Sequence, residues 1–82
     1  MAIFKPHAKL AALLGEPTIR SEAATVGELL DEVQSRVSPE DWKRASKATI
    51  LVNGRSVHYL KGMRTPLGAD DQVWMVYPAS GG

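Results

Sequence analysis

The chemistry that this sequence offers is concentrated in its last residues, Ala79, Ser80, Gly81 and Gly82. None of them has a large side chain, and the only charge among them is the terminal carboxylate of Gly82. Because glycine has no Cβ, a Gly-Gly end can enter a narrow channel and adopt backbone angles closed to other residues. We therefore expect the Gly82 carboxylate to react in the active site of another protein. A frayed end without function is the alternative, since one dipeptide is a weak motif.

The rest of the sequence presents no assembled catalytic or metal site. It contains no cysteine, which excludes a thiolate nucleophile and a disulfide. His7 and His58 lie far apart without an accompanying carboxylate pattern, so we expect ordinary surface or strand positions. Asp70 and Asp71 precede a strand, where such side chains commonly bond nearby backbone in a turn. An intrinsic enzyme is the least favoured class, and we expect neither a bound metal nor a bound cofactor.

Length and composition predict a single soluble domain. The 82 residues suffice for one core, and no apolar run approaches the roughly 18 residues of a membrane span. No signal-peptide pattern is present, so we expect a cytoplasmic protein that contacts no membrane. The net charge is +1 and the Lys and Arg residues are spread along the sequence, which argues against a nucleic-acid partner. We divide the chain into a domain over residues 1–78 and a flexible tail over residues 79–82.

An apolar strand over residues 73–77 must position this tail, and Pro78 ends it. Five consecutive apolar or aromatic residues are typical of a middle strand that is covered on both faces. Side chains alternate along a strand, so Trp74 and Val76 share one face and the other three residues share the opposite face.

The clearest helix begins at Thr25, which forms a capping box with Glu28. An apolar stripe at helical spacing follows it, consisting of Val26, Leu29, Leu30, Val33 and Val37. Ser38 and Pro39 then predict the start of a short helix that ends at Ala45. A helical turn is also expected over residues 9–15.

Four more strands are predicted, over residues 2–8, 17–22, 48–52 and 55–60. The first two form an antiparallel pair, and Asn53-Gly54 predicts a type I′ hairpin between the last two. Residues 61–71 form an irregular connection to the final strand. This order predicts an α+β fold, a mixed sheet of about five strands with one main helix across one face.

Over its full length the sequence resembles the small sulfur carriers of the ubiquitin-like β-grasp fold, such as the small subunit of molybdopterin synthase and the thiamine-biosynthesis sulfur carrier. The matching stretches are residues 8–15, 24–30, 51–54, 65–67, 69–73 and 81–82. The resemblance implies that an adenylating enzyme of the ubiquitin-activating type uses Mg-ATP to convert the Gly82 carboxylate to an acyl-adenylate. A sulfur donor then converts this to a thiocarboxylate, which serves an acceptor enzyme such as the large subunit of molybdopterin synthase.

The resemblance also implies a partner-binding surface. With Val73 and Met75 turned inward, Trp74 and Val76 form it, and Leu51 is expected beside them. Pro78, Ala79 and Ser80 continue this surface as a slim tail. The alternative is that the connection over residues 61–71 covers Trp74 through Met63.

Departures from the family pattern concern the acceptor enzyme. Residues 77–80 lack the two prolines and bulkier residue common in molybdopterin-synthase subunits, the connection over residues 53–66 is longer than in some members, and Pro6 occupies an apolar strand position. We favour the molybdopterin-synthase type over carriers for cysteine, thiamine or secondary-metabolite biosynthesis. Alternatives from other classes are a ubiquitin-like protein modifier joined to lysine amines and an interaction module with inert glycines.

Overall fold

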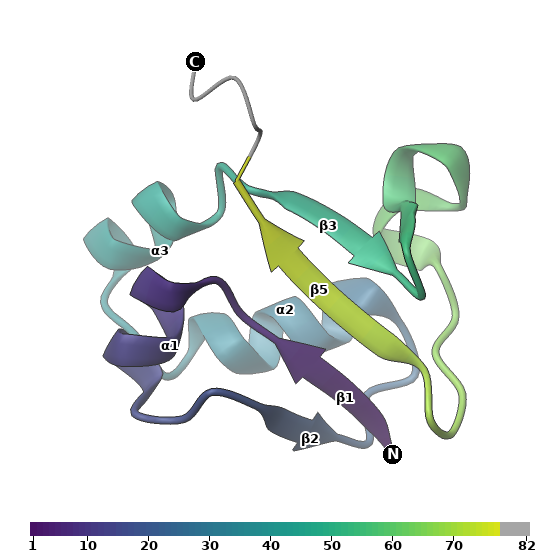
Figure 1. Cartoon of the computed structure of the whole chain (residues 1–82), viewed down its shortest axis with the longest axis horizontal. Helices are drawn as coiled ribbons and strands as arrows, with labels where there is room; N and C mark the ends of the chain where they lie inside the picture. Colours follow the sequence, from purple (N-terminus) through teal and green to yellow (C-terminus); the bar gives the residue numbers. More distant parts are fainter. Residues whose placement is uncertain (78–82) are drawn as a thin grey trace.

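A mixed five-stranded sheet forms the centre of the molecule. The computed structural model describes residues 1–77, and the five residues that follow lie outside the described part. The strands are β1 (Ala2–Lys5), β2 (Ile19–Ser21), β3 (Thr49–Val52), β4 (Arg55–Ser56) and β5 (Gln72–Val76), in the order β2-β1-β5-β3-β4 (Figure 1). β1 runs parallel to β5, and the other neighbours are antiparallel. The predicted mixed sheet with the last strand in its middle is therefore confirmed.

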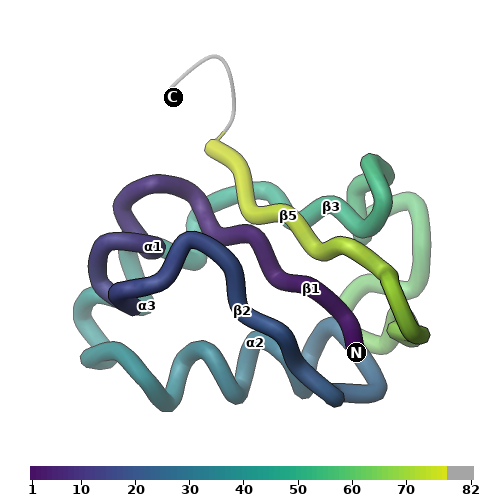
Figure 2. Tube along the Cα trace, turned by 60° about the horizontal axis from the view of Figure 1, so that its bottom comes forward, coloured from purple at the N-terminus to yellow at the C-terminus, as the bar shows by residue number. Residues whose placement is uncertain are grey.

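Within residues 1–77, three α-helices accompany the sheet: α1 (Ala8–Leu14), α2 (Val26–Gln34) and α3 (Pro39–Ala45). Figures 1 and 2 show α2 crossing one face of the sheet, while α1 and α3 lie side by side at the end of the sheet where β5 finishes. The opposite face carries no helix within residues 1–77. We call the face under α2 the inner face and the opposite one the outer face.

The core lies between the inner face and α2. Its largest fully buried side chains are those of Phe4, Leu10, Leu29, Met75, Val26, Val33 and Val73. Each such side chain contributes about 1.5–3 kcal/mol relative to an exposed one, so this contact is the main source of stability. The predicted apolar stripe of the main helix supplies three of these residues.

The helix starts follow the predicted capping signals. The Thr25 hydroxyl accepts the Glu28 N–H at 3.2 Å, but the Glu28 carboxylate accepts the Thr25 hydroxyl proton rather than a backbone N–H. Ser38 caps α3 by accepting the Asp41 N–H at 3.1 Å, with Pro39 in the first turn. Local side-chain chemistry therefore decides where both helices begin.

The strand predicted over residues 55–60 is wrong beyond Ser56. The Ser56 hydroxyl accepts the His58 N–H at 3.3 Å and starts a 3₁₀ turn, η1 (Val57–Tyr59), which takes the chain out of the sheet. A serine hydroxyl competes in this way with strand pairing for the backbone donor. The connection that follows is not wholly irregular, since it contains a second 3₁₀ turn, η2 (Gly62–Arg64), closed by Thr65.

The first strand is also shorter than predicted. It ends at Lys5 because Pro6 has no N–H to donate, and His7 then caps α1. Gly15 ends α1 at φ 78°, a left-handed conformation that favours glycine. The predicted antiparallel pairing of β1 with β2 across this helix is confirmed.

Candidate functional site

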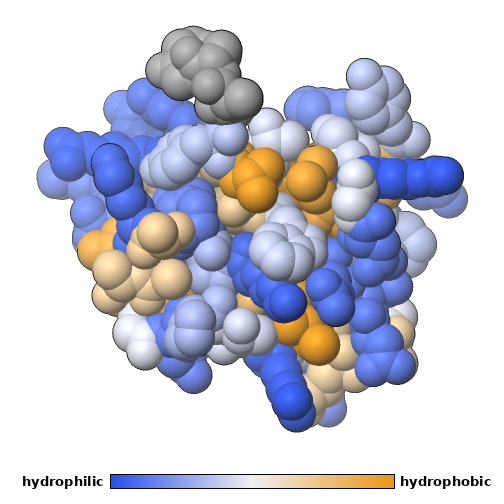
Figure 3. All heavy atoms as spheres, viewed as in Figure 1, coloured by the Kyte–Doolittle hydropathy of each residue, from blue (hydrophilic) through white to orange (hydrophobic). Residues whose placement is uncertain are grey.

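The outer face of β5 presents the residues that were predicted to contact a partner. Val73 and Met75 point inward and are fully buried, whereas Trp74 is 38% exposed. Trp74 lies opposite Leu51 in the register of β5 with β3, and Val76 lies opposite Thr49. We call Leu51, Trp74 and Val76 the platform. Figure 3 looks onto this face and shows apolar side chains gathered over β5 and β3.

The interpretation of β5 as covered on both faces is wrong for residues 1–77. The apolar run is central within the sheet, but only the inner face has a helix over it. The proposed cover of Trp74 by Met63 is also wrong, because η2 packs on α2, where a Cβ placed on Gly27 would lie 3.1 Å from the Met63 carbonyl oxygen. The platform therefore remains accessible.

The Lys5 ammonium makes a cation–π contact with the indole of Trp74. These residues are register partners between β1 and β5, and Lys5 Nζ lies 4.6 Å from the centre of the indole ring. A cation over an exposed aromatic ring contributes about 0.5–1 kcal/mol. The contact orients the ring without covering the whole of it, so part of the indole stays exposed.

His7 fixes the point at which the chain leaves the sheet. Its ring stacks on that of Tyr77, with centroids 4.3 Å apart and planes at 28°. Nδ1 accepts the Leu10 N–H at 3.2 Å, which leaves the ring proton on Nε2, 3.3 Å from the Ala45 carbonyl oxygen. The prediction of an ordinary surface or strand position missed this role. A polar residue directly between Pro6 and a helix start was the available signal.

A hollow of about 440 Å³ opens beside this stack, between α1 and α3. His7 and Tyr77 form one side, and Leu13 lies on α1. Lys9 and Arg44 supply two positive charges, and Asp41 supplies one negative charge. Tyr77, which we call the root of the tail, thus lies beside this weakly basic hollow and directly follows Val76 of the platform.

A group of hydrogen bonds, which we call the polar clamp, holds the start of β5. It involves Asn53, Gly68, Asp71 and Gln72. The Asp71 carboxylate accepts the Gly68 N–H at 2.7 Å and the Asn53 side-chain amide at 2.9 Å, and the Asn53 carbonyl oxygen accepts the Gln72 N–H at 2.9 Å. The Gly68 bond and then the Asn53 bond lower the pKa of Asp71 below its usual 3.8. The predicted turn role of this carboxylate is confirmed.

The hairpin between β3 and β4 has the predicted geometry. Asn53 and Gly54 both have positive φ, 51° and 89°, as a type I′ turn requires. Because the Asn53 side chain also reaches β5, one residue shapes the hairpin and ties it to the central strand.

The structure leaves part of the predicted site untested. Pro78, Ala79, Ser80, Gly81 and Gly82 lie outside the described residues, and their roles stay predictions. Within residues 1–77, no group of three or more His, Asp or Glu side chains could hold a metal ion. None of the helices in this part of the chain is long and apolar enough to cross a membrane.

Comparisons with known proteins identify the family. A model of the ThiS family matches residues 3–82. No curated protein matches the chain. Among solved structures, a chain of the BexX/CysO complex from Amycolatopsis orientalis is 21% identical, with a TM-score of 0.77 and 100% of both chains covered.

Two archaeal structures are also similar. Small archaeal modifier protein 1 from Methanosarcina acetivorans is 23% identical over 99% of this chain and 95% of its own, with a TM-score of 0.78. SAMP1 from Haloferax volcanii is 28% identical over 99% and 98%, with a TM-score of 0.68. Since the family match spans nearly the whole chain and the fold agrees, the chain belongs to the ThiS family of ubiquitin-like β-grasp sulfur carriers.

Proposed function

We propose that this chain carries sulfur as a thiocarboxylate on Gly82 and serves as a co-substrate of partner enzymes. The observation that carries the proposal is the position of the platform. Trp74 is exposed and Val76 is half-buried on the same strand, which ends just before Tyr77 and the Gly-Gly tail, so one partner can contact the sheet and receive the tail together. A partly exposed tryptophan next to smaller apolar residues is typical of an interface anchor.

The chemistry proceeds in two steps on the partner. The Gly82 carboxylate attacks the α-phosphate of Mg-ATP, which forms the acyl-adenylate and releases pyrophosphate. A hydrosulfide equivalent from a sulfur donor then attacks the acyl carbon, and AMP leaves. Adenylation is needed because a carboxylate is a poor electrophile, whereas AMP is a good leaving group. Mg-ATP belongs to the adenylating enzyme in this scheme, and the carrier supplies only the carboxylate.

The domain contributes a fixed origin for the tail. β5 is paired on both sides, and the His7–Tyr77 stack holds the residue that follows β5 close to α1 and α3. Five residues follow Tyr77 in the sequence, and a fully extended chain of that length spans at most about 18 Å. Gly82 can therefore reach a recessed active site while the platform stays on the partner's surface.

The acceptor is the finer part of the proposal. The sequence resemblance favours the molybdopterin-synthase type, with the large subunit of that enzyme as acceptor. The similarity to the CysO chain that was solved with BexX supports a carrier for another sulfur-accepting enzyme as the second candidate. The similarity to small archaeal modifier proteins supports a third candidate, a protein modifier joined to lysine amines.

Intact mass spectrometry tests the proposal. The protein is incubated with an adenylating enzyme of the same family, Mg-ATP and sulfide, and the expected mass gain equals the exchange of one oxygen for one sulfur. Deletion of Gly82 and omission of ATP are the controls, and both should abolish the gain. A gain that survives deletion of Gly82 would place the sulfur elsewhere and refute the proposal.

Mass spectrometry of the same samples also distinguishes a sulfur carrier from a protein modifier. A modifier leaves a Gly-Gly remnant on lysines of other proteins, which peptide mass spectrometry detects. Remnants without any thiocarboxylate intermediate would favour the modifier. Full activity of the deletion variant in the organism would favour an interaction module with inert glycines.

A further inference from the structure

Positive charge is segregated along this chain although its net charge is only +1. Between Trp42 and Ala69 the sequence contains six of its ten Lys and Arg residues and none of its nine Asp and Glu residues. The basic residues are thus not evenly scattered, which corrects the sequence-based interpretation. Charge segregation of this kind creates a local field that the net charge conceals.

Three of the six lie in one corner of the fold, where β4, η1 and η2 meet. Arg55 belongs to β4, Lys61 directly precedes η2, and Arg64 ends it. All three side chains are exposed, and none takes part in an ion pair among residues 1–77, where Arg36 and Glu16 form the one salt bridge. Their charges are therefore not neutralised within the described domain.

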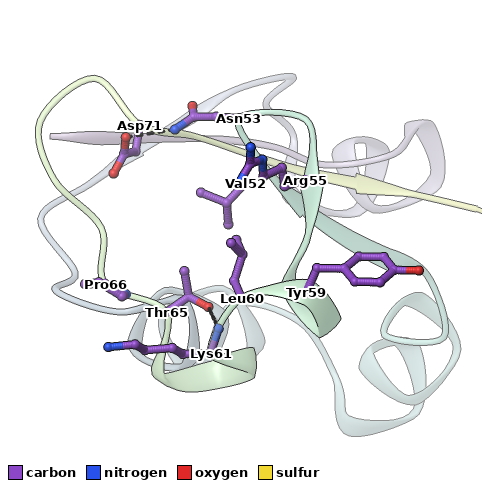
Figure 4. Close-up of a pocket in the computed structure, with 9 residues that line it drawn as sticks. All are labelled: Val52, Asn53, Arg55, Tyr59, Leu60, Lys61, Thr65, Pro66 and Asp71. Carbon is purple, nitrogen blue, oxygen red and sulfur yellow. Dashed lines mark hydrogen bonds between the residues drawn. The ribbon is translucent and has the colours of Figure 1, made fainter.

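Tyr59 stands in the same corner with 87% of its surface exposed. It belongs to η1, which packs against η2. Figure 4 shows its ring projecting away from the neighbouring hollow into the surroundings. An aromatic ring so exposed is not needed by the core, and tyrosine with arginine is the combination enriched where proteins bind each other. We call Arg55, Tyr59, Lys61 and Arg64 the basic corner.

The basic corner borders a hollow of about 620 Å³. Val52 and Leu60 face each other across it, and Pro66 adds to its apolar lining (Figure 4). Arg55 and Lys61 lie on its edges, and the Asp71 carboxylate lies at another edge, bonded to Asn53 and Gly68. The hollow therefore combines an apolar floor with cations on its rim.

We propose that the basic corner binds an acidic segment of a partner protein, with one apolar side chain of that segment in the hollow and its carboxylates beside Arg55 and Lys61. The apolar floor favours a polypeptide over a nucleic acid, because phosphates would gain nothing from Val52 and Leu60. Three cations and one tyrosine also make a small footprint for a nucleic-acid backbone.

This surface is distinct from the platform. In the register of β3 with β5, Val52 pairs with Val73 near the start of β5, whereas the tail root lies beyond Val76 at the other end. A partner segment can therefore hold the basic corner while the tail is inserted elsewhere. The inference goes beyond the proposed function and does not depend on Gly82.

A nuclear magnetic resonance titration of the full chain, labelled with ¹⁵N, tests the proposal. The probe is a short synthetic peptide of Asp and Glu residues around one central leucine. We expect saturable amide shifts at Arg55, Tyr59, Lys61 and Thr65, weakened by added salt because exposed charges are screened. A peptide with Asn and Gln in place of the acids controls for the apolar contact and should bind at least about tenfold more weakly.

Charge reversal supplies the matched variants. Arg55→Glu with Lys61→Glu should weaken the acidic peptide at least about tenfold. Lys43→Glu with Lys47→Glu makes the same change in net charge at two exposed positions outside the corner and should change affinity less than about twofold. The amide spectrum of each variant verifies the fold.

Three outcomes would overturn the inference. One is the absence of saturable shifts at the corner, and another is equal weakening by both variant pairs, which would mean that only net charge matters. The third is tighter binding of single-stranded DNA than of the acidic peptide at the same residues, which would identify a nucleic-acid surface.

Discussion

The ring of His7 stacks on the ring of Tyr77 at a centroid distance of 4.3 Å, and the same imidazole caps α1 and contacts the carbonyl of Ala45 at the end of α3. One side chain thus joins the end of β1, two helices and the root of the tail. Both ring nitrogens of His7 make polar contacts, and one face of the ring stacks on Tyr77. The direction in which the chain leaves β5 depends on this junction.

Two substitutions of His7 should separate the contribution of its helix cap from that of its stacking on Tyr77. His7→Ala removes both the cap and the stack, and we expect a loss of about 1–2 kcal/mol in the free energy of unfolding. His7→Asn retains a side-chain acceptor for the Leu10 N–H, so its loss should be smaller. Urea unfolding of the two variants and the wild type measures both values.

A double-mutant cycle with Tyr77→Ala isolates the stack. The coupling energy between His7→Asn and Tyr77→Ala should be about 0.5–1.5 kcal/mol, the usual range for paired rings. If Tyr77→Ala costs the same in both backgrounds, the rings contribute nothing to each other and the junction is only a helix cap.

The clamp at the other end of β5 should make stability depend on acidity. The pKa of Asp71 is lowered in the folded state, so its ionised form stabilises the fold above the unfolded value of 3.8, and this contribution is lost as pH falls through the folded value. Asp71→Asn loses one of the two hydrogen bonds, and we expect a cost of about 1 kcal/mol at neutral pH, since the carboxylate is partly exposed. The difference from wild type should shrink below pH 3.8.

Asp70→Asn is the control for this experiment. Asp70 has φ 67°, which asparagine tolerates, and its side chain is not part of the clamp. Thermal unfolding between neutral and acid pH should show the pH-dependent difference for position 71 alone. A difference for Asp71→Asn that stays constant down to the lowest pH would contradict the assigned cause of the pKa shift.

Much of this fold could be predicted from local signals. The capping residues Thr25 and Ser38 and the Asn53-Gly54 turn each act over a few residues, and each prediction held. The central place of β5 and the alternation of its side chains were also predicted, but its apolar run wrongly predicted cover on both faces. The end of β4 could not be predicted, because Ser56 can either pair in a strand or accept the His58 N–H. In the structure Ser56 accepts the His58 N–H, and Val57 is buried in the turn that follows.

Part of the candidate site could likewise be predicted from the sequence, and part could not. Trp74 and Val76 could be placed on one face because strand periodicity requires it. The His7–Tyr77 stack and the basic corner depend on contacts between residues distant in sequence or on elements whose form was mispredicted. The corner in particular exists because the chain turns at η1 instead of continuing as a strand, which turns Tyr59 outward.

Gly27 should resist substitution although it lies in a helix. Alanine ordinarily stabilises an exposed helical position by up to about 1 kcal/mol over glycine. Here an added Cβ would lie 3.1 Å from the Met63 carbonyl oxygen, a backbone atom of η2. We expect Gly27→Ala to be destabilising by about 1 kcal/mol, measured by urea unfolding, because overpacking outweighs the propensity gain. Glu32→Ala, exposed on the same helix, is the control, and a stabilised Gly27→Ala protein would show that η2 moves freely.

Trp74 provides the sharpest test of the platform, and the prediction rests on the proposed function. Trp74→Ala removes the anchor but leaves the tail and core unchanged, since the side chain lies on the outer face. An anchor contribution of about 2 kcal/mol corresponds to a roughly 30-fold rise in KM for the carrier in thiocarboxylate formation. Because Gly82 is intact, kcat should change little, which initial rates over a range of carrier concentrations will measure.

Met63→Ala is the matched control for this measurement. Met63 is a large apolar residue of comparable exposure, 48%, but it belongs to η2 beside α2 rather than to the outer face. Its replacement should leave KM within about twofold of the wild-type value, because scattered surface apolar residues contribute little to binding. A loss confined to kcat in Trp74→Ala would mean that the indole acts on the position of the tail instead of on docking. An equal rise in KM in both variants would mean that the platform does not contribute to recognition by the adenylating enzyme.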